Sequence, residues 1–324
     1  MFISKFKNLA LAASLLSSAA LMTLGSTAAM AAAPLAKTPA PGYFRLMLGT
    51  YEVTALSDGT VDLPMEKLLV EPEAKTTEAL AKAFLKTPVE TSVNAYLINT
   101  GSKLVLIDTG AGGLFGPTLG KLIANLKASG YQPEQIDDIF ITHMHGDHVG
   151  GLATKGAINF PKATVHADQR ESVYWLSAAN MEKAPADKKG MYQGAMDSLN
   201  PYLAAKKVDL FKGSSELVPG VKSYSTYGHT EGHTVYVVES EGQKLLLIGD
   251  LIHVAAVQLD NPEVTIAFDT DQKEAAKMRE KVFTEAAQQG ALVGASHIQF
   301  PGLGHLKKSG KSYQWVPVNF TQMR

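Results

Sequence analysis

Three histidines and an aspartate lie within six residues, in the segment His143-Met144-His145-Gly146-Asp147-His148. Imidazole nitrogens and carboxylate oxygens are ligands for zinc-like ions. His143 and His145 are two residues apart, so both rings can turn toward one ion as a strand opens into a loop. Asp147 and His148 would then face a neighbouring second ion. The spacing predicts a hydrolytic metal centre, and a histidine-rich surface loop is the alternative.

The apolar run Ile139-Phe140-Ile141-Thr142 precedes this segment and predicts a buried strand. Three more candidate ligands follow predicted strands: His229 comes after 221–225, Asp250 after 244–249, and His297 after 292–295. In α/β folds, sites form where strands run out into loops at one edge of a rigid sheet. We therefore expect these side chains to meet at one edge.

The rest of the chain alternates between predicted strands and helices. Further strands are expected over 51–57, 92–100, 103–108, 163–167 and 234–239, with a turn at Asp58-Gly59 and a return over 61–64. Helices are expected over 76–86, 117–129, 168–176 and 271–289. The segment 178–207 contains two prolines, Pro185 and Pro201, and two glycines, Gly190 and Gly194, which predicts an irregular insertion or lid, not a second domain.

A glycine-rich segment follows the strand over 103–108, with the sequence Asp108-Thr109-Gly110-Ala111-Gly112-Gly113. A loop that cradles phosphate is one interpretation. The segment lacks the GxxxxGK[ST] pattern and a following lysine, which favours a structural turn.

The N-terminus has the features of a secretory signal peptide. Lys5 and Lys7 precede an apolar run from Leu9 to about Leu24, and Ala29-Met30-Ala31 matches a cleavage signature. We predict a signal peptide over 1–31, a flexible leader over 32–41 and one hydrolase domain over 42–324, with export to the periplasm or medium. A membrane anchor is the alternative, but small residues weaken the apolar run and no basic stop-transfer residues follow closely.

Composition limits the kind of partner. After removal of the signal peptide about 290 residues remain, enough for one large α/β domain or two small ones. The net charge of −1 argues against a nucleic-acid partner and favours small neutral substrates. The chain contains no cysteine, so it has neither disulfides nor thiolate ligands.

Four sequence motifs resemble those of the metallo-β-lactamase superfamily. They are Thr-His-Met-His-Gly-Asp-His-Val-Gly-Gly-Leu (142–152), Gly-His-Thr-Glu-Gly-His-Thr (228–234), Gly-Asp-Leu-Ile (249–252) and Val-Pro-Val-Asn (316–319). Within the superfamily the chain is most similar to bacterial methyl parathion hydrolases and related lactonases, from about Pro41 to Phe320. The resemblance implies an α/β fold, the single-domain αββα sandwich, with a dimetal centre along one edge of the paired sheets.

The resemblance also implies a ligand set for two divalent ions, with zinc expected. His143, His145 and His229 would hold one ion, while Asp147, His148 and His297 would hold the other. Asp250 would bridge the two ions, which could then share a hydroxide that acts as the nucleophile. His229 occupies the family's Gly-His position, so His233 is expected to be structural. A homodimer is also implied.

Substrate choice would depend on the pocket walls. The resemblance places Phe115 and Trp175 in an aromatic pocket for the leaving group, with core packing as the alternative. His253 stands where related lactonases present a tyrosine and the parathion hydrolases carry an aliphatic residue. We expect His253 to hydrogen bond the carbonyl oxygen or protonate the leaving alkoxide, with a passive wall as the alternative. Ile266 is expected to line the same pocket; His166 and His305 are expected to be structural.

The predicted function is therefore a secreted dinuclear hydrolase of lactones or aryl esters, with some phosphotriesterase activity. Catalytic roles are assigned to Asp250, Asp147 and His253. The alternative on the same fold is an enzyme whose principal substrates are organophosphate triesters. A β-lactamase with a cysteine ligand, a glyoxalase II and a nucleic-acid hydrolase fit less well. A non-catalytic zinc-binding protein is the alternative from a different class.

Overall fold

Alternating side chains along the central strands bury both faces of two sheets. In β3 (Val89–Asn99), Leu97 packs toward the outer helices while Tyr96 and Ile98 face the second sheet. In β13 (Gln243–Leu247) the same alternation sends Leu246 outward and its neighbours Leu245 and Leu247 inward. Because successive strand residues point to opposite faces, this pattern requires an apolar layer on each side of each sheet.

The computed structural model describes residues 33–323, so the predicted signal peptide over 1–31 lies outside the described residues. Residues 33–39 contain no helix or strand. The chain from Ala40 onward forms a compact unit of its own. Among the described residues, no helix is both long and apolar enough to cross a membrane.

The described strands form two main sheets and a small hairpin. The first sheet has the order β1 (Tyr43–Leu48), β2 (Tyr51–Leu63), β3, β4 (Leu104–Ile107), β5 (Asp138–Phe140), β8 (Thr164–Asp168), β9 (Val208–Phe211). The second has the order β10 (Glu216–Val218), β11 (Val221–Ser225), β12 (Thr234–Ser240), β13, β14 (Leu292–Gly294), β15 (Leu303–Ser309), β16 (Ser312–Pro317). The hairpin pairs β6 (Ala153–Thr154) with β7 (Ala157–Ile158).

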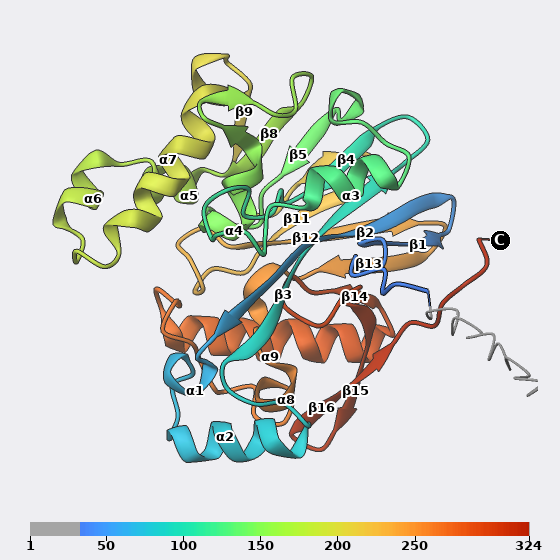
Figure 1. Cartoon of the computed structure of the whole chain (residues 1–324), viewed down its shortest axis with the longest axis vertical. Coiled ribbons are helices and arrows are strands. Elements are labelled where there is room, and N and C mark those ends of the chain that lie inside the picture. The colour runs from blue at the N-terminus through green and yellow to red at the C-terminus, as the bar shows by residue number, and fades with distance from the viewer. Residues whose placement is uncertain (1–32, 324) are drawn as a thin grey trace, which may run out of the picture. The chain divides into compact units, whose positions relative to one another are not determined.

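Helices cover the outer face of each sheet (Figure 1). Those on the side of the first sheet are α3 (Leu122–Ala128), α4 (Gly146–Val149), α5 (Gln169–Trp175), α6 (Ala178–Lys183) and α7 (Lys189–Ala204). On the other side lie α1 (Met65–Leu68), α2 (Glu73–Lys82), α8 (Ala255–Gln258) and α9 (Gln272–Gln289). Short 3-10 turns span Pro133–Gln135, Gly150–Leu152 and Gly249–Leu251. This layering confirms the predicted αββα sandwich.

The turn predicted at Asp58-Gly59 is wrong, because β2 continues through it with a bulge between Ser57 and Gly59. The Asp58 side chain is buried and accepts hydrogen bonds from the backbone N–H groups of Ala111, Gly120 and Leu122, each at 2.9 Å. Asp-Gly therefore serves here to bring a carboxylate into the core, where it holds the loop over 110–122.

The prediction that the segment 178–207 is irregular is wrong, because α6 and α7 occupy most of it. In α7, Tyr192, Ala195, Leu199 and Tyr202 are buried at spacings of three and four residues. This apolar stripe packs against the first sheet and outweighs the unfavourable helix propensity of its glycines and Pro201.

Several element boundaries also differ from the predictions. Two predicted helices are shorter than expected, covering 73–82 instead of 76–86 and 122–128 instead of 117–129. Strands β1, β9 and the hairpin of β15 with β16 were not predicted. They are edge or near-edge strands with partly exposed residues, and their sequences are short or break the alternation of apolar and polar residues that predicts a strand.

Candidate metal centre

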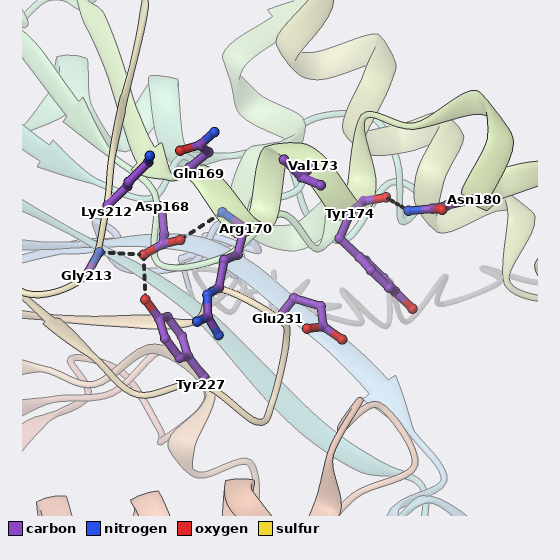
Figure 2. A pocket seen from close by; sticks show the side chains of 10 residues that line it. All are labelled: Asp168, Gln169, Arg170, Val173, Tyr174, Asn180, Lys212, Gly213, Tyr227 and Glu231. Atoms are coloured by element: carbon purple, nitrogen blue, oxygen red, sulfur yellow. Dashed lines mark hydrogen bonds between the residues drawn. The ribbon is translucent and has the colours of Figure 1, made fainter.

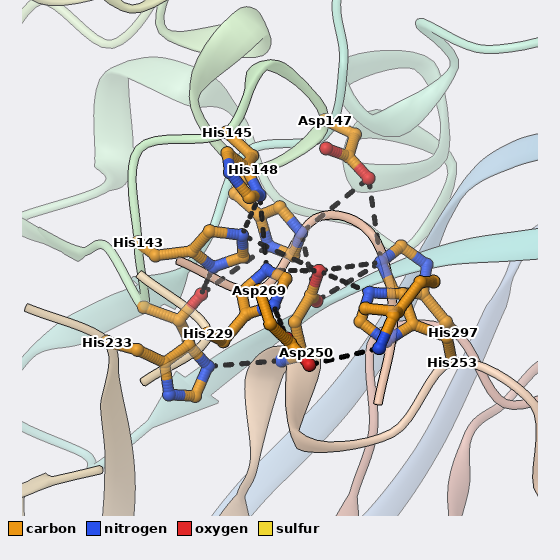
Figure 3. A network of polar contacts seen from close by, with 12 residues as sticks. His143, His145, Asp147, His148, His229, His233, Asp250, His253, Asp269 and His297 are labelled. Carbon is orange, nitrogen blue, oxygen red and sulfur yellow. Dashed lines mark hydrogen bonds and ion pairs between the residues drawn. The ribbon is translucent and has the colours of Figure 1, made fainter. Parts of the chain in front are cut away.

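The seven predicted ligands converge at one edge of the paired sheets (Figure 3). His143 and His145 lie in the loop after β5, and Asp147 and His148 lie in α4, which begins directly after that loop. The remaining three follow β11, β13 and β14: His229, Asp250 and His297. The expectation that strand ends bring these residues together is confirmed by their positions.

The first cluster consists of three imidazoles and one carboxylate oxygen. His145 Nδ1 lies 2.9 Å from His143 Nε2 and 3.1 Å from His229 Nε2. Asp250 Oδ2 lies 3.5 Å from His143 Nε2 and 3.3 Å from His229 Nε2. Each ring nitrogen directs one lone pair or one proton in its plane, and here they point to a shared centre. Such a set of donor atoms suits a tetrahedral zinc-like ion.

The second cluster uses the other oxygen of Asp250. Oδ1 lies 3.1 Å from both His148 Nε2 and His297 Nε2, and Asp147 Oδ2 lies 3.6 Å and 3.5 Å from the same nitrogens. Among the described residues, His148 Nε2 and Asp250 Oδ1 are buried and have no hydrogen-bond partner. A cation would satisfy these atoms, so the residues fit a pair of divalent ions that share Asp250.

Buried groups hold the far side of three of the ligand rings, those of His148, His229 and His297. Asp108 Oδ2 lies 2.8 Å from His148 Nδ1, and Asp269 Oδ1 lies 2.7 Å from His229 Nδ1. His297 Nδ1 lies 2.9 Å from the carbonyl oxygen of Ser92. When an ion is bound, such contacts would keep the ring proton on Nδ1 and direct the Nε2 lone pair toward the ion.

The glycine-rich segment has a structural role through Asp108. Besides its contact with His148, this carboxylate accepts hydrogen bonds from the backbone N–H of Thr142 at 2.8 Å and from its hydroxyl at 2.7 Å. Thr142 is the residue immediately before His143. Asp108 thus fixes the point where the ligand loop begins.

The charges of the cluster are distributed unevenly. Burial lowers the pKa of His143 and His145 well below the usual range, and neighbouring imidazoles add to this effect. Burial also raises the pKa of Asp250, but the surrounding histidines, His148 first, outweigh it and hold that pKa well below its usual value. For His148, Asp250 and two further carboxylates outweigh burial and raise the pKa. Asp250 is therefore an ionised acceptor, while His143 and His145 present neutral lone pairs.

His233 lies outside both clusters of donor atoms. Its Nε2 accepts a hydrogen bond from the backbone N–H of Asp250 at 3.2 Å, and its Nδ1 lies 2.8 Å from Thr226 Oγ1. His166 and His305 also lie away from the clusters, against Asp138 at 2.9 Å and the carbonyl of Ala291 at 3.0 Å.

A cavity of about 380 Å³ opens onto the metal ligands. Its walls are largely apolar, and its lining includes Val61, Leu63, Leu114, Phe115, Leu119, Met191 and Phe268. His145, Asp147, Asp250, His253 and His297 face the same cavity. Phe115 lines it as predicted: the residue is 49% exposed, and its ring packs over Gly146, where an added Cβ would lie 2.9 Å from Phe115 Cε2.

Two residues predicted for the pocket do not line this cavity. Trp175 is 3% exposed and packs behind His145, with 5.1 Å between ring centroids. Ile266 is fully buried in a separate apolar cluster with Met65 and Val254. Their apolar side chains serve the core, which is the alternative that sequence alone left open for Trp175.

His253 lines the cavity beside Asp250. Its Nε2 lies 3.1 Å from Asp250 Oδ2, and its ring stacks on that of His297 with 5.0 Å between centroids. Burial lowers the pKa of His253 to about 4, although Asp250 opposes this shift. Since the carboxylate can only accept, the single proton of the neutral ring lies on Nε2.

A second cavity of about 670 Å³ lies on another side of α5 (Figure 2). Its lining includes Asp168, Arg170, Tyr174, Lys212, Tyr227 and Glu231, and none of the seven predicted ligands. Arg170 stacks on the ring of Tyr227 at 4.1 Å. This cavity is therefore separate from the metal centre.

Comparison with known proteins identifies the family. The model of the "Metallo-beta-lactamase superfamily" matches residues 88–297, a range that contains all seven predicted ligands. The chain belongs to this superfamily. The predicted family and fold are thereby confirmed.

Two relatives in the superfamily are similar over part of their length. An "N-acyl homoserine lactonase" from Bacillus sp is 30% identical over 175 residues, which cover 47% of this chain and 61% of the relative. A "Beta-lactamase-like protein 2 homolog" from Caenorhabditis elegans is 37% identical over 87 residues, 26% of this chain and 28% of the relative. The match to the lactonase thus spans less than two thirds of that protein.

Two solved structures of the superfamily align over most of the chain. "Hydrolase AbOPH in beta lactamase superfamily" has 38% identity and a TM-score of 0.84, covering 88% of this chain and 100% of the other. "AidC, a Dizinc Quorum-Quenching Lactonase", solved "in complex with a product N-hexnoyl-L-homoserine", has 26% identity and a TM-score of 0.80, covering 87% of this chain and 99% of the other.

Proposed function

We propose that this protein is a dinuclear zinc hydrolase of lactones, with aryl esters as further substrates and phosphotriesters as minor ones. The observation that carries the proposal is the pair of ligand clusters sharing Asp250 at the floor of an apolar cavity. The lactonases among the relatives and solved structures support the same reaction class.

Two zinc ions, when bound, would lower the pKa of a water molecule to about 7 and polarise the substrate oxygen. His143, His145 and His229 would hold one ion, Asp147, His148 and His297 the other, and Asp250 both. Asp108 and Asp269 keep two of these imidazoles in the tautomer that ligates.

The protein's own side chains would position the substrate and exclude bulk water from the site. The apolar walls would hold the acyl or aryl part of a substrate and keep bulk water from the ligands. Asp147, with a side chain 21% exposed, lines the same cavity, so the second ligand cluster would lie next to the ester that reacts. His253 is proposed to donate its Nε2 proton to the ester or lactone oxygen; the Asp250 oxygen that accepts this proton in the metal-free protein would instead face a bound ion.

An enzyme whose principal substrates are aryl organophosphate triesters is the second candidate. The aromatic walls favour it, since Phe115 and Phe268 both line the cavity and could stack on an aryl leaving group. Position 253 discriminates between the two. His253→Ile should lower lactone turnover and leave aryl phosphotriester turnover equal or raised, whereas a parallel loss of both would overturn the role of His253.

The deciding experiment compares kcat/KM of the zinc-loaded protein on a lactone panel and on an aryl dialkyl phosphate. Asp250→Asn is the metal-centre control. Lactones preferred by more than tenfold, about 1.4 kcal/mol of transition-state preference, support a lactonase. A preference for the phosphate would support the second candidate. Absence of zinc-dependent turnover on every substrate would favour a non-catalytic zinc-binding protein.

A further inference from the structure

Glu171 is a fully buried carboxylate that the reaction outlined above does not use. It lies in α5, and each of its oxygens accepts one backbone hydrogen bond. Oε2 accepts from the N–H of Met144 at 2.8 Å, and Oε1 accepts from the N–H of Gly232 at 2.6 Å. Both oxygens thus act as acceptors, as in an ionised carboxylate.

The two donors belong to the two loops that supply the first cluster. Met144 stands between His143 and His145, and Gly232 lies three residues after His229. The loops are far apart in sequence, and within the described residues Glu171 is the side chain that hydrogen bonds to the backbone of both. One carboxylate therefore sets the spacing between the three imidazoles of this cluster.

Helix α5 is itself held firmly at both ends. Asp168 caps it by accepting from the N–H of Arg170 at 2.8 Å, and its other oxygen accepts from the Tyr227 hydroxyl at 3.0 Å (Figure 2). At the far end the Trp175 ring packs against His145. Glu171 is thus presented from a fixed support.

The contact between α5 and the second loop is close. A Cβ added to Gly232 would lie 2.9 Å from the backbone nitrogen of Glu171 and 3.0 Å from its Cγ. Any larger residue at 232 would push the loop away from the helix. Gly232, the second glycine of the Gly-His-Thr-Glu-Gly-His motif, is therefore required because Glu171 approaches its backbone so closely.

No ion pair joins Glu171 to a basic side chain within residues 33–323. Burial raises the pKa of Glu171, while the Thr230 side chain, the two backbone N–H groups and nearby His229 favour its ionised form. The carboxylate thus lies beside three candidate ligands of a cation. A charge so placed favours an occupied metal site over an empty one.

We propose that Glu171 is a positioning residue for the ion held by His143, His145 and His229. By joining the two ligand loops it holds these three imidazoles at the spacing that one ion requires. The inference rests on the ligand assignment made under the proposed function, and it concerns the affinity for that ion, not the choice of substrate.

The test measures zinc affinity by titration of the metal-free protein against a competing chromophoric chelator. In Glu171→Gln, an amide N–H replaces one acceptor and would face a backbone donor. We expect the affinity for the ion held by His143, His145 and His229 to fall about 10–100-fold. The affinity for the other ion should change less than about threefold. Repeating the titration in the Asp147→Asn background, which lacks a ligand of the second cluster, assigns the affected ion.

Asp58→Asn is the matched control. Asp58 is also a buried carboxylate satisfied by backbone N–H groups, but its donors lie in the loop over 110–122 and not in a ligand loop. Asp58→Asn should lower thermal stability and leave the affinity for the ion held by His143, His145 and His229 unchanged. Equal weakening of zinc binding in both variants, or lower stability without any change in zinc affinity in Glu171→Gln, would overturn the proposal.

Gly232→Ala provides a second route if Glu171→Gln does not fold, since it displaces the same contact from the loop side. The same selective weakening is expected, and unchanged affinity would overturn the proposal. A wild-type protein that binds no zinc would overturn the ligand assignment itself. A wild type with two zinc sites and unaffected variants would overturn only the role of Glu171.

Discussion

The backbone N–H of Asp250 donates to Nε2 of His233 across 3.2 Å. Burial lowers the pKa of His233 to about 3, so its ring is neutral near pH 7. Because Nε2 accepts, the ring proton lies on Nδ1 and donates to Thr226 Oγ1, 2.8 Å away. His233 therefore holds the shared carboxylate residue through its backbone and has no lone pair left for an ion.

Replacing His233 should cost stability without removing a metal ligand. In His233→Leu the buried N–H of Asp250 loses its acceptor, and the free energy of unfolding should fall by about 1–3 kcal/mol. Zinc stoichiometry, measured on the dialysed protein, should remain two ions per chain. His145→Leu is the control that removes a proposed ligand and should lose an ion. A stoichiometry of one in His233→Leu would make His233 a ligand after all.

The convergence of the candidate metal ligands could be predicted because their pattern is local. His143 to His148 lie within six residues, and the other ligands directly follow apolar strands. Their outer partners could not be predicted in this way. Asp269 is 40 residues from His229 and Glu171 is 27 from Met144, so only the folded chain brings them together.

Residue type alone also fails to separate a pocket wall from the core. Phe115 and Trp175 were both expected to line the pocket, yet one is half exposed and the other buried behind His145. Both are large aromatic residues, but Phe115 lies in the loop between β4 and α3, and Trp175 ends α5, where α7 packs against it. In the described fold Tyr192 of α7 covers Trp175, with 4.8 Å between ring centroids.

The free energy of unfolding should fall at low pH in part because of Asp138, whose carboxylate contacts His166 and Lys103. Asp138 Oδ1 lies 2.9 Å from His166 Nε2, and Oδ2 lies 2.7 Å from Lys103 Nζ. Burial raises the pKa of Asp138, but the hydrogen bonds from His166 and Lys103 outweigh it and lower the pKa overall. A lowered carboxyl pKa gives stability that is present above the unfolded value, about 3.9, and is lost as the pH falls through the folded value.

Asp138→Asn should therefore lower the free energy of unfolding by about 1.5–3 kcal/mol at pH 7, and the difference from wild type should shrink toward pH 3. Urea denaturation of the metal-free protein at both pH values measures this without metal release. Asp209→Asn is the control, since its exposed carboxylate lies 3.6 Å from the other nitrogen of His166 and should matter little. A difference that stays constant between pH 7 and pH 3 would contradict this assignment.

Two glycines one turn apart on α7, Gly190 and Gly194, line the cavity above the ligands. Neither has a positive φ, so no backbone conformation requires glycine there. A Cβ at Gly190 would meet no atom within 4 Å, while one at Gly194 would lie 3.2 Å from Leu114 Cδ1. A glycine inside a helix lowers helix stability by about 1 kcal/mol relative to alanine. These two glycines therefore leave space at the cavity wall at some cost in stability.

Gly190→Leu should therefore fill part of the cavity and select against bulky substrates. We expect kcat/KM to fall at least about tenfold, roughly 1.4 kcal/mol, on lactones with long acyl chains and to change less than about threefold on short ones. Gly190→Ala should lower kcat/KM by a smaller factor, again more for long acyl chains than for short ones. Gln193→Leu places the same side chain on an exposed position of α7 and should leave the profile unaltered. An equal loss on all chain lengths would mean that Gly190→Leu disturbs the helix instead of the space it borders.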